Sequence, residues 1–329
     1  MDERYSNSIK HRKDRERMSR YAFGGDVGGT TVKLGLFDGE GTLLDKWEIP
    51  TVTENQGAAI LPDVAASIKG KMEEKGLEEA DVAGIGIGVP GSVNRNGLLV
   101  GRAVNLGWDS FDIPKALDAY IKVPVKAAND ANVAAFGEMW QGGAKGYENM
   151  VAVTLGTGVG GGIIVEGRLL AGATGAGGEI CHLHLQDGEE ETCNCGNNGC
   201  LEQYTSATGI VRLAKRRLGE DEKPSTLRDG EITAKAVFDA VKEGDAVAIE
   251  IAERFGYYLG KGLAIVAAVV NPEVFVIGGG VSKAGEILLT FVEPNFRKYA
   301  FPQCKGAKFV LAELGNDAGI YGAAALVLR

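Results

Sequence analysis

The sequence predicts an α/β protein made of two similar units, and three observations lead to this prediction. The chain has 329 residues, 45% of them hydrophobic, which is enough for two cores in units of roughly 150 residues each. A pattern of strand, glycine-rich turn and strand occurs twice, at 21–51 and at 149–172. Helical and strand patterns alternate after each hairpin, as in a mixed sheet that has a parallel part.

The first unit is predicted to span 21–140. A helix follows its hairpin over 57–76, because four apolar residues recur there at a spacing of four: Ile60, Val64, Ile68 and Met72. Strand and helix patterns then alternate: a buried strand at 82–91, a helix near 114–121, a strand at 123–130 and a helix at 131–141. Two glycines in the first strand, Gly24 and Gly25, predict only lower local stability.

The second unit is predicted to span 141–316. Its hairpin is followed, after a long interval, by three recognisable elements: a helix at 246–270, a strand at 273–282 and a strand at 307–314. A C-terminal helix over 317–329 is expected to complete the first unit. Residues 1–20 contain no apolar run and are interpreted as a disordered or tag-like tail, not as a secretory signal.

Composition excludes several classes of partner. The chain carries 35 basic and 44 acidic residues, a formal charge of −9, which disfavours binding to nucleic acid or to an anionic membrane. Its longest apolar run, 263–270, is far shorter than the ~20 residues that cross a bilayer. We therefore expect a cytoplasmic protein whose partners are small molecules.

Three of the five cysteines form a C-x-C-x₄-C motif at Cys193, Cys195 and Cys200. A cytoplasmic chain disfavours disulfides, and a redox pair would usually show C-x-x-C, so a metal is the better interpretation. Three thiolates and one imidazole make the tetrahedral set that structural zinc prefers. His182 and His184 both lie close enough in sequence to supply the imidazole, and local chemistry does not separate them. A zinc site there could be a stabilising clip without a role in chemistry.

Three glycine clusters suggest backbone that approaches a ligand. The stretch "LGTGVGGG" matches a dinucleotide pattern, but a strand follows it where that fold needs a helix. What remains is a set of turns whose amides could hold phosphate oxygens, or which are ordinary tight turns. The residues concerned are Gly28, Gly29, Gly156, Gly158, Gly160, Gly278, Gly279 and Gly280, with Thr30, Thr31, Thr157 and Lys33 as further phosphate contacts.

Two aspartates lie where strands end. Asp26 ends the first strand and could hold Mg²⁺, directly or through water, or could simply form the turn. Asp130 follows the strand at 123–130 and precedes a helix, where ligands of open α/β sheets bind and where a carboxylate stays ionised. It is a candidate general base, and the alternative is a plain N-cap.

Taken together, the motifs resemble the repressor, open-reading-frame, kinase (ROK) family, and are most similar to its bacterial glucokinases. The resemblance runs from about residue 21 to the end of the chain. The motifs that carry it occur in the expected order: "DVGGTT", "GVPG", "NDAN", "LGTGVGGG", "GGEICH", "CNCGNNGCLEQYTSATG" and "VIGGGVS". The cysteine motif is the most specific of them.

The resemblance implies an actin-like, ribonuclease H-like ATPase fold, duplicated, with two lobes around a cleft and a zinc-stapled loop in the second lobe. It implies ATP-dependent phosphorylation of a hexose at the 6-hydroxyl, most simply glucose, with Asp130 as the base and Asp26 serving Mg²⁺. In this family the histidine of "GGEI-x-H" binds both sugar and zinc, which favours His182 as the fourth ligand. The implied sugar contacts are Gly91, Asn105, Asn129, Asp130, Glu179, His182 and Glu202.

The resemblance leaves alternatives and one departure. The sugar could instead be N-acetylmannosamine, allose, fructose or mannose, which present similar hydroxyls. The family also includes sugar-sensing repressors, but only about twenty residues precede the first strand, too few for their DNA-binding domain. A zinc-dependent nucleic-acid module conflicts with the acidic charge. Cys181 stands where family members commonly have glycine. A homodimer or homotetramer is expected from the family.

Overall fold

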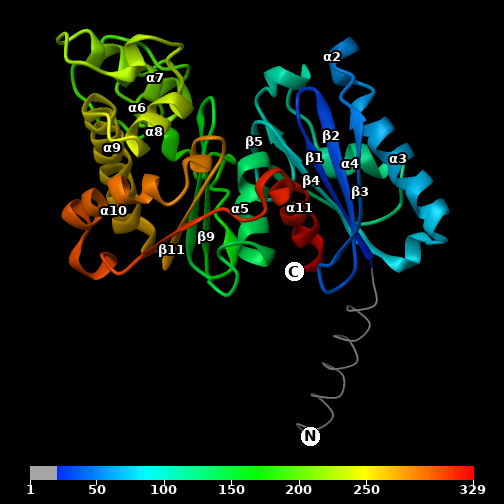
Figure 1. Ribbon diagram of the computed structural model, residues 1–329. Helices are drawn as coiled ribbons and strands as arrows, with labels where there is room; N and C mark the ends of the chain where they lie inside the picture. Colours follow the sequence, from blue (N-terminus) through cyan, green and yellow to red (C-terminus); the bar gives the residue numbers. More distant parts are fainter. Residues whose placement is uncertain (1–20) are drawn as a thin grey trace, which may run out of the picture. The chain divides into compact units, whose positions relative to one another are not determined.

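The computed structural model describes residues 21–329 and divides them into two compact units (Figure 1). The first unit comprises 21–145, 169–177 and 316–329, and the second comprises 146–168 and 178–315. The prediction of a tail at 1–20 lies outside the described residues. Within 21–329, no helix combines the length and apolar character that a membrane crossing requires.

The first unit is built on a five-stranded sheet whose order is β3-β2-β1-β4-β7. β1 pairs antiparallel with β2, and β2 with β3, while β4 and β7 run parallel to β1. The strands are β1 (Tyr21–Val27), β2 (Thr31–Phe37), β3 (Leu43–Pro50), β4 (Val82–Val89) and β7 (Val125–Asn129). A separate two-stranded hairpin follows β4, made of β5 (Ser92–Val93) and β6 (Leu99–Val100).

The second unit repeats this arrangement with the order β10-β9-β8-β11-β12. β8 pairs antiparallel with β9, and β11 and β12 lie parallel to β8. The strands are β8 (Met150–Leu155), β9 (Val159–Val165), β10 (Arg168–Leu169), β11 (Val274–Gly278) and β12 (Lys308–Leu311). The two sheets have the same strand order and the same directions, which confirms the predicted duplicated α/β architecture.

Helices cover both faces of the first sheet. On one face lies α3 (Ile60–Lys75), and its four apolar residues predicted to share a face are all buried in one core with Phe23 and Ile87. α5 (Asp130–Gln141) and α11 (Ala318–Leu328) pack on each other and contact β4 and β7. The remaining helices of this unit are short: α2 (Glu54–Gly57) and α4 (Ile113–Asp118). Figure 1 shows α11, coloured red, beside the blue N-terminal strands.

The alternation of glycine and isoleucine in β4 has a packing cause. Ile85 and Ile87 point into the core under α3, whereas a side chain on Gly86 would lie 1.7 Å from the carbonyl oxygen of Ala323 in α11. Gly24 in β1 meets α11 in the same way, since a Cβ there would lie 2.0 Å from the Ile320 carbonyl oxygen. The prediction that Gly24 only weakens its strand was therefore wrong, because its lack of a side chain admits the helix.

Helices of the second unit form its large core with β8, β9 and β11. The predicted helix at 246–270 is confirmed as α9 (Ala246–Val270). The sequence did not predict four other helices of this unit: α6 (Glu202–Thr205), α7 (Ala207–Leu218), α8 (Ala234–Lys242) and α10 (Ile287–Tyr299). α10 contains Pro294 and α6 is a single turn, so neither gives a clear helical period.

Candidate functional site

Asn129 and Asp130 join β7 to α5 in the first unit. Asn129 is the N-cap of α5, since its Oδ1 accepts a hydrogen bond from the Asn132 amide at 3.1 Å. Its Nδ2 donates to the Gly91 carbonyl at 3.1 Å and to Asp130 Oδ1 at 2.8 Å. The capping role weighed for Asp130 therefore belongs to Asn129, and Asp130 presents an exposed carboxylate at the start of the helix.

Asp26 lies near this carboxylate at the end of β1. Its environment raises its pKa from 3.8 to about 6, mainly through burial and then through the negative charge of Asp130, while Lys33 opposes the rise. Its carboxylate also lies where a side chain on Gly319, at the start of α11, would fall. Two neighbouring carboxylates that disfavour each other's charge are a donor set that suits a divalent cation.

The first glycine turn is closed by its own backbone. The Gly28 amide donates to the Thr31 carbonyl at 3.0 Å, and Thr51 Oγ1 donates to the Gly28 carbonyl at 2.7 Å. A Cβ on Gly29 would lie 3.6 Å from the Asn105 side chain, so the structure brings this turn beside a predicted sugar contact. Lys33 Nζ donates to the Asn316 carbonyl at 3.2 Å, which directs it toward the start of α11.

The structure groups His182, Cys193, Cys195 and Cys200, and their ligand atoms lie within 4.8 Å of one another. The Sγ atoms of Cys195 and Cys200 are 3.6 Å apart, and Cys193 Sγ lies 3.8 Å from His182 Nδ1. His184 is engaged elsewhere, with Asn198 O at 2.8 Å and Asp187 Oδ1 at 3.0 Å. The donor set fits tetrahedral zinc, and it includes His182 and excludes His184.

Glu202 begins α6, two residues after the last cysteine of the motif. Its Oε2 accepts a hydrogen bond from the Val159 amide at 2.9 Å, and a side chain on Gly158 would lie 2.5 Å from the same oxygen. Glu202 therefore lies against the second glycine turn, and a side chain on Gly158 would require its carboxylate to move. The predicted contact of Gly158 with a phosphate stays a prediction.

Glu179 and Cys181 stand beside His182, the candidate fourth ligand of the cysteine cluster. The buried Cys181 Sγ lies 3.5 Å from Glu179 Oε2, and the two residues form with His182 a second group of close ligand atoms. Burial, followed by the charge of Glu179, raises the pKa of the Cys181 thiol well above its usual range. The thiol at this position therefore stays protonated and packs beside Glu179.

The third glycine cluster follows β11. Gly279 has a φ of +84°, and a side chain on it would strike the backbone of Leu155, so it is needed for packing. Gly280 has open space around it and lines a cavity of about 350 Å³. The other lining residues come mainly from α8 and from the turn after β11, among them Thr233, Ala234, Phe238, Val281, Lys283 and Ala284.

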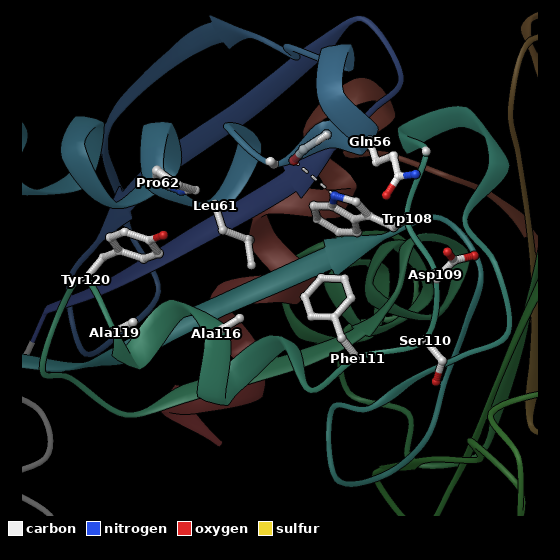
Figure 2. A pocket seen from close by; sticks show the side chains of 13 residues that line it. Gln56, Leu61, Pro62, Trp108, Asp109, Ser110, Phe111, Ala116, Ala119 and Tyr120 are labelled. Carbon is white, nitrogen blue, oxygen red and sulfur yellow. Dashed lines mark hydrogen bonds between the residues drawn. The ribbon is translucent and has the colours of Figure 1, made fainter.

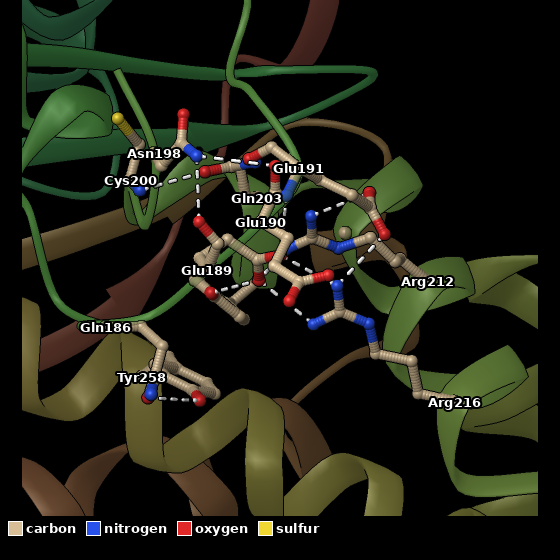
Figure 3. A network of polar contacts seen from close by, with 12 residues as sticks. Gln186, Glu189, Glu190, Glu191, Asn198, Cys200, Gln203, Arg212, Arg216 and Tyr258 are labelled. Carbon is tan, nitrogen blue, oxygen red and sulfur yellow. Dashed lines mark hydrogen bonds and ion pairs between the residues drawn. The ribbon is translucent and has the colours of Figure 1, made fainter.

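A polar network that the sequence did not reveal ties the cysteine loop to α7 (Figure 3). At its centre the side chain of Glu189, only 2% exposed, accepts two hydrogen bonds from Arg216, at 2.8 and 2.9 Å. The hydroxyl of Tyr204 donates to the same carboxylate at 2.5 Å, and Arg212 contacts it at 3.3 Å. The four-residue spacing of the arginines on α7 was the available signal, but their partner is distant in sequence.

A cavity of about 500 Å³ in the first unit contains none of the predicted site residues (Figure 2). Trp108 forms part of its wall, and its Nε1 donates to the Gly57 carbonyl at 3.1 Å. The wall is largely apolar, with Leu61, Pro62, Phe111, Ala116 and Tyr120. The cavity adjoins Asn105 through Gly107, yet its composition does not match a polyhydroxylated ligand.

Comparisons with known proteins cover nearly the whole chain. Residues 22–329 match the model described as "ROK family". The chain is 43% identical over 313 residues to a glucokinase of Halalkalibacterium halodurans, covering 94% of this chain and 95% of the relative. It is 31% identical to the xylose repressor of Caldicellulosiruptor bescii, over 75% of this chain and 63% of the repressor.

Among solved structures, the fold is similar to a ROK family glucokinase from Streptomyces griseus in complex with glucose and AMPPNP. The TM-score is 0.71 at 33% identity, and the match covers 93% of this chain and 98% of the other. A ROK hexokinase from Thermus thermophilus gives a TM-score of 0.77 at 32% identity over 92% of this chain and 96% of the other. The chain is a member of the ROK family and has the mixed α/β fold of its sugar kinases.

Proposed function

We propose that the protein transfers the γ-phosphoryl group of ATP to the 6-hydroxyl of glucose. The observation that carries this proposal is the arrangement at the start of α5. There Asn129 caps the helix, fixes the exposed Asp130 carboxylate and reaches back to Gly91. The 43% identity with a glucokinase along 94% of the chain supports glucose as the acceptor.

Asp130 would act as the general base toward the acceptor hydroxyl. Phosphoryl transfer demands positioning and charge stabilisation more than covalent chemistry, so a fixed carboxylate and a fixed sugar suffice. We assign the sugar contacts to Gly91, Asn105 and Asn129 in the first unit and to Glu179, His182 and Glu202 in the second. The base would accept the proton as the hydroxyl attacks the γ-phosphorus.

The nucleotide would use the glycine turns and the cavity beside Gly280. That cavity of about 350 Å³ is bounded by apolar residues, including Phe238 and Val281, which suits an adenine ring. Open space around Gly280 allows a ligand to approach the backbone. The glycine turn at Gly28 and Gly29, with Thr30, Thr31 and Thr157, would hold phosphate oxygens.

Two metals fit the residues present. Mg²⁺, held by Asp26, would neutralise charge on the transferred phosphate. Zn²⁺ held by His182, Cys193, Cys195 and Cys200 would brace the loop that delivers Glu202, whose carboxylate lies 3.9 Å from Cys193 Sγ. We further propose that the protein is cytoplasmic and that it forms a homodimer or homotetramer. Analytical ultracentrifugation tests the oligomeric state.

An ADP-release assay across glucose, N-acetylmannosamine, allose, fructose and mannose tests the function. We expect the highest kcat/KM with glucose. A clear preference for an N-acetylated sugar would mean that this sugar, and not glucose, is the substrate. If no sugar led to ADP release, the proposed kinase activity would be refuted. The second candidate is a sugar-responsive repressor, which the likeness to the xylose repressor favours. Sugar binding without turnover would support it.

A further inference from the structure

Another cavity, of about 270 Å³, lies in the first unit beside β7, an edge strand of its sheet. Its walls come from the β5 hairpin, from β7, from the start of α5, and from Leu169, Ala171 and Leu326. None of the residues that line it is acidic, although the whole chain carries a formal charge of −9. The sequence assigned no role to any of these residues.

The strongest indication of a ligand is the side chain of Asn132. Asn132 is 3% exposed and lines the cavity, and its Oδ1 has no hydrogen-bond partner among residues 21–329. Leaving a buried polar atom unpaired costs about 1–3 kcal/mol, so such atoms usually have a partner. The amide oxygen needs a donor such as a hydroxyl, and the cavity is where one could bind.

Two cationic side chains line the same cavity. Lys126 Nζ donates to the Leu326 carbonyl at 2.5 Å, at the end of α11, and carries no carboxylate partner in the described chain. Arg95, on the turn of the β5 hairpin, is exposed and forms no ion pair with any residue of 21–329. Two cationic side chains beside one concave surface favour the binding of an anion there. The paired N–H donors of the Arg95 guanidinium match the spacing of phosphate oxygens.

We propose that this cavity binds a phosphorylated monosaccharide, with a sugar hydroxyl donating to Asn132 Oδ1 and the phosphate held by Arg95 and Lys126. A hydroxylated ligand with one anionic group meets both requirements, and the volume suits one sugar ring rather than a nucleotide. The product of the proposed reaction belongs to this class, so the regulatory part of the inference rests on the proposed function.

The cavity is connected to the proposed sugar contacts on two sides. The Asn132 amide donates to Asn129 Oδ1, and Asn129 in turn donates to the Gly91 carbonyl. Val93, which also lines the cavity, follows Gly91 by two residues in the chain. A ligand that joins the β5 hairpin to α5 therefore acts on Gly91 and Asn129 together. We expect it to raise the KM for glucose about 5-fold, the lower range of allosteric coupling.

Calorimetric titration of glucose 6-phosphate into the full chain, saturated with glucose and ADP, tests the site. We expect one binding event, weakened at least about tenfold in Arg95→Ala. The matched control is Lys69→Ala, which removes an exposed cation of α3 that forms no ion pair with residues 21–329, and it should leave binding unchanged. Lys126→Met should weaken binding as Arg95→Ala does, while glucose turnover without added product stays at the wild-type rate in both.

Titration with inorganic phosphate and with glucose alone distinguishes the ligand class. Phosphate that binds as tightly as glucose 6-phosphate would overturn the sugar-phosphate assignment, and so would full binding by Arg95→Ala. Absence of any binding event would overturn the site itself. The ADP-release assay on the same preparation separates the two proposals. If the protein binds glucose 6-phosphate through Arg95 but does not phosphorylate glucose, the proposed kinase function is refuted and the proposed binding site is retained.

Discussion

At the scale of single residues, Asn129 and Asp130 have different roles at the start of α5. Asn129 is the N-cap of the helix, and Asp130 Oδ1 accepts a hydrogen bond from the Ala131 amide at 2.8 Å. Because asparagine keeps an acceptor oxygen there, Asp130→Asn should leave the helix intact. We expect Asp130→Asn to lower kcat at least about 100-fold, which is the size of a general-base contribution. Steady-state ADP release measures kcat, and calorimetry with glucose shows whether sugar binding is retained. Near-normal turnover in a variant that still binds glucose would contradict the assignment.

The raised pKa of Asp26 predicts that the free energy of unfolding depends on pH. Its folded-state pKa is about 6, above the ordinary 3.8, so the folded protein favours the protonated carboxyl. The resulting stabilisation is fully present below pH 3.8 and is lost as pH rises through 6, a change of about 3 kcal/mol in the free energy of unfolding. Asp26→Asn should remove this dependence and be more stable than the wild type at pH 7.

Urea denaturation of wild type and Asp26→Asn across this pH range provides the measurement. Mg²⁺ should raise the thermal midpoint of the wild type at pH 7, because a cation stabilises the ionised carboxylate, and should have little effect on the variant. An equal response of both proteins to Mg²⁺ would mean that Asp26 does not hold the metal. Identical pH profiles would contradict the raised pKa.

At the scale of elements, the Glu189 network attaches the cysteine loop to α7 independently of the proposed zinc site. Arg216 and then Tyr204 hold the pKa of Glu189 at about 2, against the cost of burial, so the charge persists at any physiological pH. Removing the charge leaves Arg216 and Arg212 without their buried partner. We expect Glu189→Gln to lower the free energy of unfolding by about 3 kcal/mol.

The matched control for this variant is Glu190→Gln, which removes an exposed carboxylate from the next position. The free energies of unfolding of the two variants, measured by urea denaturation, should differ by most of the predicted 3 kcal/mol, that is, by about 2–3 kcal/mol. The rate of zinc release to a chromogenic chelator should also rise in Glu189→Gln only. If the two variants were equally stable, the buried ion pair would contribute nothing beyond an exposed charge.

The two histidines near the cysteine motif provide a paired test of the metal site. His182→Ala should lower the zinc content per chain, because the fourth donor is lost, whereas His184→Ala should retain it. Stripping zinc from the wild type should raise the KM for glucose or unfold the second unit, since Glu202 follows the motif directly. An apoprotein with unchanged KM and thermal midpoint would show that the clip has no part in sugar binding.

At the scale of the whole chain, α11 carries the C-terminus to the sheet that begins the chain. The contact depends on glycines, because a side chain on Gly86 would overlap the α11 backbone. Gly86→Ala should therefore lower the free energy of unfolding by about 3 kcal/mol or more. Gly70→Ala lies in α3 with nothing within 4 Å of the added Cβ, and should stabilise by up to about 1 kcal/mol. Chemical denaturation of both variants checks this difference of sign.

Much of the fold could be predicted where local patterns are strong. Apolar periodicity is a property of neighbouring residues. It was therefore sufficient to predict the helix at 246–270, the buried face of α3 and the repeated hairpins. The helices α7 and α8 were missed although their buried residues recur at helical spacing, among them Ile210, Leu213 and Ala214 in α7 and Val237, Phe238 and Val241 in α8. The grouping of Cys193, Cys195 and Cys200 with His182 could be predicted because cysteine is rare in the chain and its spacing is specific.

The sequence by itself determined the duplicated α/β architecture, the family and the residue types available for chemistry. Only the tertiary structure decided which group performs which task. It groups His182 rather than His184 with the three cysteines, makes Asn129 rather than Asp130 the helix cap, and explains Gly24 by the close approach of α11. The reason is physical: a periodic pattern reports on neighbours within a few residues, whereas a hydrogen-bond partner or a steric exclusion depends on atoms that folding brings from far along the chain.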